Sequence, residues 1–206
     1  LQAQINPHFL FNTLQSIQFE IRQKEGNDSK IAEITEELSD ILKYALGDPK
    51  QQVSLSEEIQ YLKRYVNIQK MRFGDKFILY YEIEENLKEH HVFRLLLQPI
   101  VENSILHGVR YREHGYIKIK IYQSKQIQKI IVAVIDSGIG MTKEELMAQR
   151  KTISRYNPNH VGLANVNCRL KLYYGEEAQL HIYSKKDMGT VVTVSYTHLR
   201  AHETLM

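Results

Sequence analysis

The amino-acid sequence predicts an α+β protein, in which an N-terminal helical hairpin precedes a two-layer α/β sandwich with a mixed, mostly antiparallel sheet. Through residues 1–46, apolar side chains recur three and four positions apart, as in helices that pack along a seam. After Gly74, the apolar period changes to two, which is typical of strands. The predicted strands come in adjacent pairs with helices grouped between them, and this order favours a sheet that helices cover on one face.

The first two helices form the predicted hairpin. Residues 1–25 carry four apolar residues at alternating spacings of four and three, which is the seam of a coiled-coil-like helix. They are Leu10, Leu14, Ile17 and Ile21. Residues 26–28 break this helix, and Ser29 is a good N-cap for the next, which runs to about Leu46. The seam of this second helix is Ile31, Ile34, Leu38, Ile41 and Ala45. One hairpin cannot bury both seams, so we expect two copies of the chain to form a four-helix bundle.

The later elements follow in order along the chain. Ser54 and Glu57 form the pattern of a capping box, which predicts a third helix. Strands are predicted at residues 77–83, 117–122, 129–135, 180–184 and 190–195. Further helices are predicted over residues 95–108, from Thr142, and over 162–174. We therefore expect a helical region over residues 1–73, a second domain over 74–195, and a disordered or non-native tail over 196–206.

Composition narrows the functional classes. The net charge of +3 is spread along the chain without a stripe of Lys and Arg, so we do not expect nucleic-acid binding. Cys168 is the only cysteine, which excludes a disulfide framework and a multi-cysteine zinc site, and favours a reducing compartment. No apolar run approaches the ~20 residues that span a bilayer. The sequence begins at Leu1 within a helical pattern, so we expect it to be the C-terminal piece of a longer protein.

The helix over residues 95–108 has one mostly apolar face and one polar face. The first carries Leu97, Ile100, Val101, Ser104 and Ile105. Asn103 and His107 lie on the polar face, one turn apart, together with Pro99. The amide oxygen of an asparagine is a ligand that suits Mg²⁺, which usually binds alongside phosphates. An ordinary exposed helix face also explains these residues.

Asp136 follows a predicted strand, and two glycines, Gly138 and Gly140, come soon after it. One interpretation is a tight turn in which the carboxylate accepts a hydrogen bond from its own backbone and the glycines supply positive φ. The other is a base-binding site, because a carboxylate accepts hydrogen bonds from an exocyclic amine such as that of adenine. The sequence leaves both interpretations open.

Gly162 stands at the start of the last predicted helix. The backbone N–H groups of a helix start, together with the helix dipole, are suited to bind phosphate, although glycine is also common there for steric reasons. The polar residues 151–160 before it are interpreted as a mobile lid over a nucleotide.

The order of these motifs resembles the ATP-binding domain that sensor histidine kinases share with DNA gyrase and the Hsp90 chaperones. The resemblance covers roughly residues 77–195 and implies that Asn103 binds Mg²⁺, that Asp136 binds adenine, and that the glycine-rich segments line the base and the phosphates of ATP. The nucleotide-binding residues that it implies are Asn103, Asp136, Gly138, Gly140, Gly162, Leu163, Asn165, Gly189 and Thr190. We also count His107 among them, from its place on the polar face one turn after Asn103.

Residues 2–14 resemble the phosphoacceptor segment of the YesM- and LytS-type sensor histidine kinases, and residues 97–103 and 162–175 also resemble this branch. The resemblance implies that His8 is phosphorylated from Mg·ATP. It further implies that the phosphoryl group passes to an aspartate of a response regulator, in two-component signal transduction. One exposed histidine among nine is the simpler interpretation of His8 taken alone.

Two positions depart from related proteins. Gyrase-like ATPases place a water-activating glutamate where this chain has Pro99. Without that glutamate, the γ-phosphoryl group is less easily lost to water, which suits its transfer to a side chain. Many histidine kinases carry an acidic residue directly after the phosphoacceptor, and this chain has Phe9. The proton acceptor is therefore open, with Asn12 and Glu102 as candidates.

The resemblance also sets expectations for the whole protein. We expect a homodimer, with the present residues in the bacterial cytoplasm and a membrane-bound N-terminal sensor region outside this sequence. We expect a hinge around Gly74, which lets His8 and the nucleotide approach each other. The alternative function is an ATP-gated dimerisation module without phosphotransfer, and a phosphatase activity toward the regulator is a further candidate.

Overall fold

The chain is described here by a computed structural model that covers residues 7–26, 29–48, 50–154 and 162–197. It divides into two compact units. The first consists of Leu1–Gly74 with His91–Leu95, and the second of Asp75–His90 with Leu96–Met206. The chain therefore leaves the first unit after Gly74, returns to it for a short segment, and leaves it again after Leu95.

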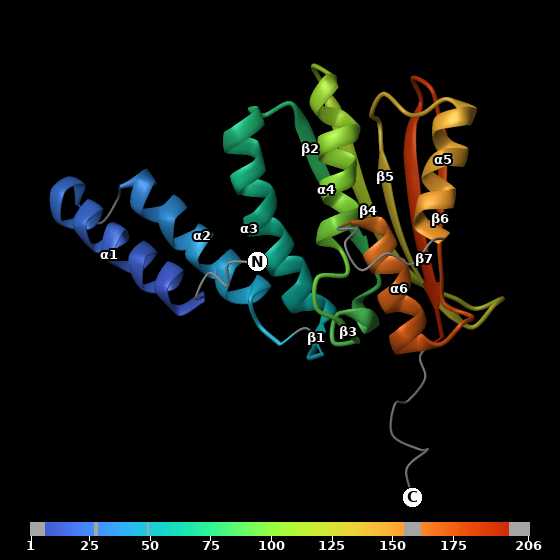
Figure 1. The fold of residues 1–206 in the computed structure, drawn as a ribbon, viewed down its shortest axis with the longest axis horizontal. Coiled ribbons are helices and arrows are strands. Elements are labelled where there is room, and N and C mark those ends of the chain that lie inside the picture. The colour runs from blue at the N-terminus through green and yellow to red at the C-terminus, as the bar shows by residue number, and fades with distance from the viewer. Residues whose placement is uncertain (1–6, 27–28, 49, 155–161, 198–206) are drawn as a thin grey trace, which may run out of the picture. The chain divides into compact units, whose positions relative to one another are not determined.

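In the first unit, α1 (Pro7–Glu25) and α2 (Lys30–Ala45) form a helical hairpin, as the sequence predicts (Figure 1). The Ser29 hydroxyl caps α2 by accepting a hydrogen bond from the Ala32 N–H at 3.4 Å. The buried positions of α2 hold small side chains, which are Ala32, Thr35 and Ser39. Several residues of the predicted seams are more than a third exposed, namely Ile17, Ile31 and Leu38. Packing within one hairpin therefore leaves apolar surface on both helices.

The first unit also contains a short two-stranded ribbon. Its strands are β1 (Gln52–Ser54) and β3 (His91–Phe93), which pair antiparallel. The helix α3 (Leu55–Phe73) follows β1 directly and starts with the predicted capping box. The Glu57 N–H donates to the Ser54 hydroxyl at 3.1 Å, and the Ser54 N–H donates to the Glu57 carboxylate at 2.9 Å. The sequence predicts α3 but neither short strand.

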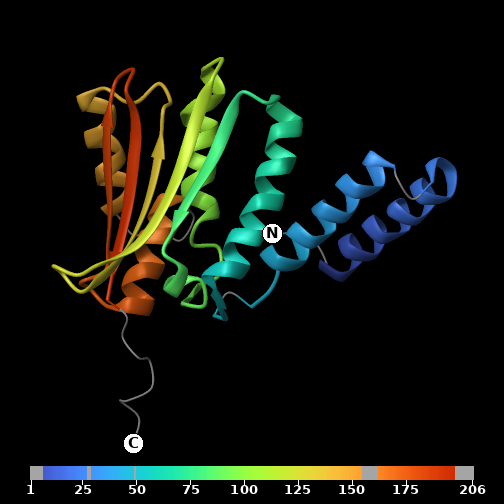
Figure 2. The same ribbon diagram turned by 180° about the vertical axis from the view of Figure 1, so that it is seen from behind.

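The second unit is built on a five-stranded sheet (Figure 2). In spatial order, its strands are β2 (Phe77–Ile83), β4 (Gly115–Ser124), β5 (Lys129–Asp136), β7 (Gly189–Tyr196) and β6 (Gln179–Lys185). β2 pairs parallel with β4, and the other neighbours pair antiparallel, so the predicted mixed, mostly antiparallel sheet is confirmed. Two 3₁₀ helices, η1 (Glu85–Leu87) and η2 (Val109–Tyr111), lie in its connections.

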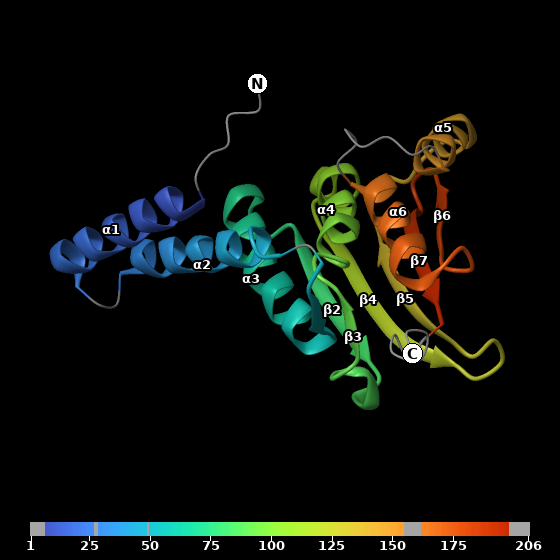
Figure 3. The same ribbon diagram turned by 60° about the horizontal axis from the view of Figure 1, so that its bottom comes forward.

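Three helices cover one face of this sheet, as Figure 3 shows. They are α4 (Gln98–His107), α5 (Lys143–Ser154) and α6 (Leu163–Tyr174). Side chains of β4 alternate between this core and the opposite face, because successive residues of a strand point to opposite sides. Those in the core are Ile117, Ile119 and Ile121. In the described parts of the chain, no helix combines the length and the hydropathy that crossing a bilayer requires.

Candidate functional site

The helix α4 carries the first group of predicted site residues. It begins at Gln98 rather than at Leu95, and Pro99 lies in its first turn, where the missing N–H interrupts no helical hydrogen bond. All residues of the predicted apolar face are buried. They are Leu97, Ile100, Val101, Ser104 and Ile105. On the polar face, Asn103 is half-buried and His107 is exposed. The helix therefore presents a polar side, as the sequence predicts.

Asp136 ends β5 and is only 3% exposed. Its Oδ1 atom accepts hydrogen bonds from the backbone N–H groups of Gly138, at 2.9 Å, and Thr190, at 3.2 Å. Burial raises the pKa of the Asp136 carboxyl above its ordinary value, while the hydrogen bonds from Gly138 and Thr190 oppose this shift. Three predicted site residues from two strands and a turn thus meet at one carboxylate.

Close backbone contacts require three glycines of the predicted site. A Cβ atom on Gly138 would lie 2.3 Å from the Cα atom of Gly108, at the end of α4. Gly140 and Gly189 have φ of +61° and +97°, and a Cβ atom on either would lie 1.9 Å from a backbone carbonyl oxygen. Positive φ is therefore present at Gly140 but not at Gly138. The sequence assigns no role to Gly108, because its contact with Gly138 joins segments that are distant along the chain.

The start of α6 holds the third group of predicted residues. Gly162 precedes the helix with φ of +112°, and its carbonyl oxygen accepts a hydrogen bond from the Asn165 N–H at 3.1 Å. Leu163 is buried, and Asn165 is exposed. Of the predicted lid, residues 151–154 form the last turn of α5, and residues 155–160 lie outside the described residues.

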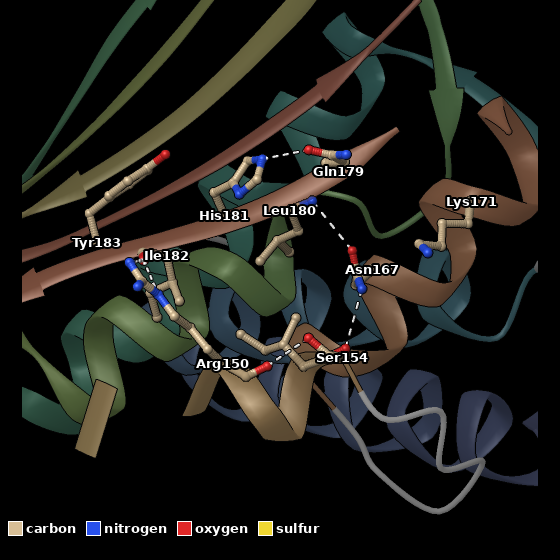
Figure 4. Close-up of a pocket in the computed structure, with 10 residues that line it drawn as sticks. Arg150, Ser154, Asn167, Lys171, Gln179, Leu180, His181, Ile182 and Tyr183 are labelled. Atoms are coloured by element: carbon tan, nitrogen blue, oxygen red, sulfur yellow. Dashed lines mark hydrogen bonds between the residues drawn. The ribbon is translucent and has the colours of Figure 1, made fainter. Parts of the chain in front are cut away.

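Two side chains missed by the sequence reasoning link α5 and α6 to the edge strand β6 (Figure 4). Arg150 donates to the Ile182 carbonyl oxygen from Nε, at 3.2 Å, and from Nη2, at 2.8 Å. Asn167 donates from Nδ2 to the Ile153 carbonyl oxygen at 3.2 Å, and its Oδ1 accepts from the Leu180 N–H at 3.3 Å. These side chains line a pocket of about 370 Å³ and occupy backbone groups on the open edge of the sheet.

We expect Asn167→Ala to lower the free energy of unfolding of the second unit by about 1–2 kcal/mol, because the Ile153 carbonyl and the Leu180 N–H lose their hydrogen bonds to this side chain. The matched control is Asn165→Ala on the same helix, where the side chain is exposed and the change should stay below about 0.5 kcal/mol. Urea unfolding of both variants measures the difference. Equal stability of the two variants would contradict the role given to Asn167.

The remaining predicted residues divide between the units. His8 and Asn12 belong to α1 in the first unit, and the side chain of Asn12 is exposed. Glu102 is half-buried on α4 in the second unit. The predicted phosphoacceptor and the predicted nucleotide-binding residues therefore lie on separate units, and the two proton-acceptor candidates are divided between them.

Comparison with known families places the chain in a defined class. Residues 92–200 match the family described as "Histidine kinase-, DNA gyrase B-, and HSP90-like ATPase", and the chain belongs to this family. Residues 1–77 match the family described as "Histidine kinase". The predicted membership of the sensor histidine kinases is thereby confirmed.

Individual relatives agree with this membership. Proteins named "Sensor protein kinase HptS" from Staphylococcus aureus strains bovine RF122 / ET3-1 and USA300 are 35% identical over 195 residues, an alignment that covers 93% of this chain and 36% of theirs. The chain thus spans about a third of the length of these relatives.

Solved structures share the fold. The "Histidine kinase domain from Erythrobacter litoralis EL346 blue-light activated histidine kinase" matches with a TM-score of 0.51 at 15% identity, over 93% of this chain and 85% of that one. The catalytic domain of the histidine kinase ThkA matches with a TM-score of 0.53 at 18% identity, over 71% of this chain and 94% of that one. At such identities, the likeness concerns the fold alone.

Proposed function

We propose that the chain is the ATP-dependent protein-histidine kinase portion of a two-component sensor. It transfers the γ-phosphoryl group of Mg·ATP to His8, and the group then passes to an aspartate of a response regulator. The observation that carries this proposal is the presence of two family segments in one chain, a histidine kinase segment over residues 1–77 and an ATPase segment over residues 92–200.

The side chains of the second unit fit Mg·ATP in their chemistry. The Asp136 carboxylate only accepts hydrogen bonds, so it suits the exocyclic amine of adenine. Asn103 offers a neutral amide oxygen to Mg²⁺ from a half-buried position, and His107 lies one turn further along the helix. Mg²⁺ supplies charge neutralisation at the phosphates. The other nucleotide-binding residues of this proposal are Gly138, Gly140, Gly162, Leu163, Asn165, Gly189 and Thr190.

The transfer itself needs positioning more than covalent assistance. A nitrogen of the His8 imidazole attacks the γ-phosphorus, the bond from phosphorus to the bridging oxygen breaks, and ADP leaves. A neutral imidazole carries a free lone pair on one ring nitrogen, so this nucleophile can attack phosphorus without prior activation. Asn12 and Glu102 remain the candidates for accepting the proton that the imidazole loses. Pro99 replaces a water-activating glutamate, which favours transfer over hydrolysis.

The exposed apolar residues of the hairpin support a homodimer. Ile17, Ile31 and Leu38 belong to the predicted seams and are incompletely covered within one hairpin. A second hairpin covers them in a four-helix bundle, which removes their apolar surface from water. We further propose that this dimer lies in the cytoplasm and is joined to a membrane-bound sensor region outside this sequence.

The direct test is incubation of the purified chain with γ-labelled ATP and Mg²⁺. We expect label on the protein that survives alkali and is released by acid, as a phosphorus–nitrogen bond requires, and we expect no label after chelation of the metal. Binding of ATP without labelling would instead support the ATP-gated dimerisation module. Addition of candidate response regulators then tests the second transfer.

A further inference from the structure

A buried carboxylate in the first unit connects three segments of the chain. Glu58, in the first turn of α3, is 0% exposed. Its Oε2 atom accepts hydrogen bonds from the Tyr44 hydroxyl, at 2.5 Å, and from the Leu95 backbone N–H, at 3.0 Å. Tyr44 lies at the end of α2, and Leu95 is the last residue of the segment His91–Leu95, which contains β3. We call Tyr44, Glu58 and Leu95 the Glu58 bridge.

Arg94 makes further hydrogen bonds from the segment His91–Leu95 to the end of α2 and to Gln51. Its Nη1 atom donates to the Tyr44 carbonyl oxygen at 2.8 Å, and its Nη2 atom donates to the Gln51 side chain at 2.5 Å. The guanidinium carbon lies 4.6 Å from the centroid of the Tyr44 ring, and this ring also stacks on the Tyr61 ring, with the two centroids 4.1 Å apart. The end of α2 is thus held to residues 94–95 through both its backbone and its side chain.

The choice of a carboxylate at position 58 has a physical reason. A glutamine could also accept both hydrogen bonds, and it would avoid the free-energy penalty of burying an ionisable group. A carboxylate accepts stronger and shorter hydrogen bonds than a neutral amide does. At position 58, these stronger bonds to Tyr44 and Leu95 offset the larger cost of burying the carboxylate. Burial and the nearby Glu58 carboxylate raise the pKa of Tyr44 well above its ordinary value, so its hydroxyl stays a hydrogen-bond donor.

The bridge ends at an unusual backbone position. Leu95 has φ of +62°, in the left-handed region that residues other than glycine rarely adopt. It is the last residue of the first unit, and α4, with Asn103, begins three residues later at Gln98. The hydrogen bond to Glu58 therefore holds the strained residue through which the chain enters α4.

We propose that the Glu58 bridge is a positioning element, which links the C-terminal end of α2 to Leu95 and so to the residues that lead into α4. A change in the helical hairpin alters phosphoryl transfer through this link. This inference rests on the proposed function and adds a regulatory connection to it. Tyr44 is the sensing residue, because its hydroxyl joins the end of α2 directly to the Glu58 carboxylate. Glu58 passes the change to Leu95.

Tyr44→Phe tests the proposal with the smallest change, because it removes the hydroxyl and keeps the ring against Tyr61 and Arg94. We expect the rate of His8 phosphorylation at saturating ATP to fall about tenfold, which corresponds to one hydrogen bond to a charged group. The dissociation constant for a non-hydrolysable ATP analogue should stay within about twofold. Tyr80→Phe, at an exposed tyrosine of β2, is the matched control and should change neither quantity.

Hydrogen exchange gives a readout that is independent of activity. In the unsubstituted chain, binding of the ATP analogue should change amide exchange in residues 40–46, and Tyr44→Phe should remove this response. Glu58→Gln keeps an acceptor oxygen and should give an intermediate response, which also tests the bridge if Tyr44→Phe unfolds the first unit.

A Tyr44→Phe variant that matches the unsubstituted chain in transfer rate and in exchange would overturn the proposal. If the unsubstituted chain takes no label from ATP, the proposed kinase function fails, and the exchange response alone decides whether the bridge couples the two segments.

Discussion

Substitution of His8 by alanine is expected to reduce phosphorylation of the chain to background. Alanine offers no nitrogen that could attack the γ-phosphorus, and a missing nucleophile cannot be replaced by better positioning. ATP affinity should not change, since the proposed nucleotide-binding residues lie in the second unit and His8 in the first. The measurements are incorporation of γ-labelled phosphate and equilibrium binding of a fluorescent ATP analogue.

A second histidine provides the matched control for this experiment. His114 is exposed in the second unit, and His114→Ala should retain full labelling. Acid-labile phosphate on the His8→Ala variant would show that another residue is the phosphoacceptor. Loss of label from both variants would point to a general effect on the protein rather than to the role of His8.

Asp136→Asn is expected to weaken binding of Mg·ATP by about 100-fold. The amide replaces one carboxylate oxygen by an N–H₂ donor, which faces the adenine amine donor-to-donor, and a lost hydrogen bond to a charged group is worth about 1.5–3 kcal/mol. Calorimetry with a non-hydrolysable analogue measures the affinity. Asp187→Asn, at an exposed aspartate, should leave the affinity unchanged. Unchanged binding by Asp136→Asn would place the adenine elsewhere.

The same substitution is expected to preserve or raise the stability of the nucleotide-free protein at neutral pH. Burial raises the pKa of Asp136 in the folded state, so its ionised form opposes folding, and the stability that the protonated form contributes is lost as pH rises through the folded pKa. Asparagine carries no such charge. In urea unfolding, the advantage of Asp136→Asn should therefore shrink as pH falls toward about 4, the ordinary pKa of an aspartate.

The sequence predicts those parts of the fold that leave a long periodic pattern. All five strands of the main sheet appear where alternation predicts them, and the two-layer α/β arrangement follows from their order. β1 and β3 escape prediction because three residues are too few to show alternation, and their pairing joins distant segments. The start of α4 shifts from Leu95 to Gln98, because Leu95 has a φ of +62°, which lies outside the helical region and leaves no periodic signal in the sequence.

The site shows the same limit. Asp136 and Gly140 are recognised from a local turn pattern, and Thr190 from its place before the last strand. Asn167 and Glu58 are not recognised, because their hydrogen-bond partners lie on other elements and no spacing along the chain records them. Local turn patterns can therefore be recognised in the sequence, while side chains that join distant segments require the structure.

The pairing of β1 with β3 has a consequence for biosynthesis. A ribosome releases the chain from its N-terminus, so α1, α2 and α3 emerge before the segment that contains β3, Arg94 and Leu95. Until then, the end of α2 and the Glu58 carboxylate lack the contacts that this segment brings. β2 is also made earlier than β3. The end of α2 can thus make these contacts only after translation has produced β2, the first strand of the second unit. The two units therefore complete their folding in an overlapping order.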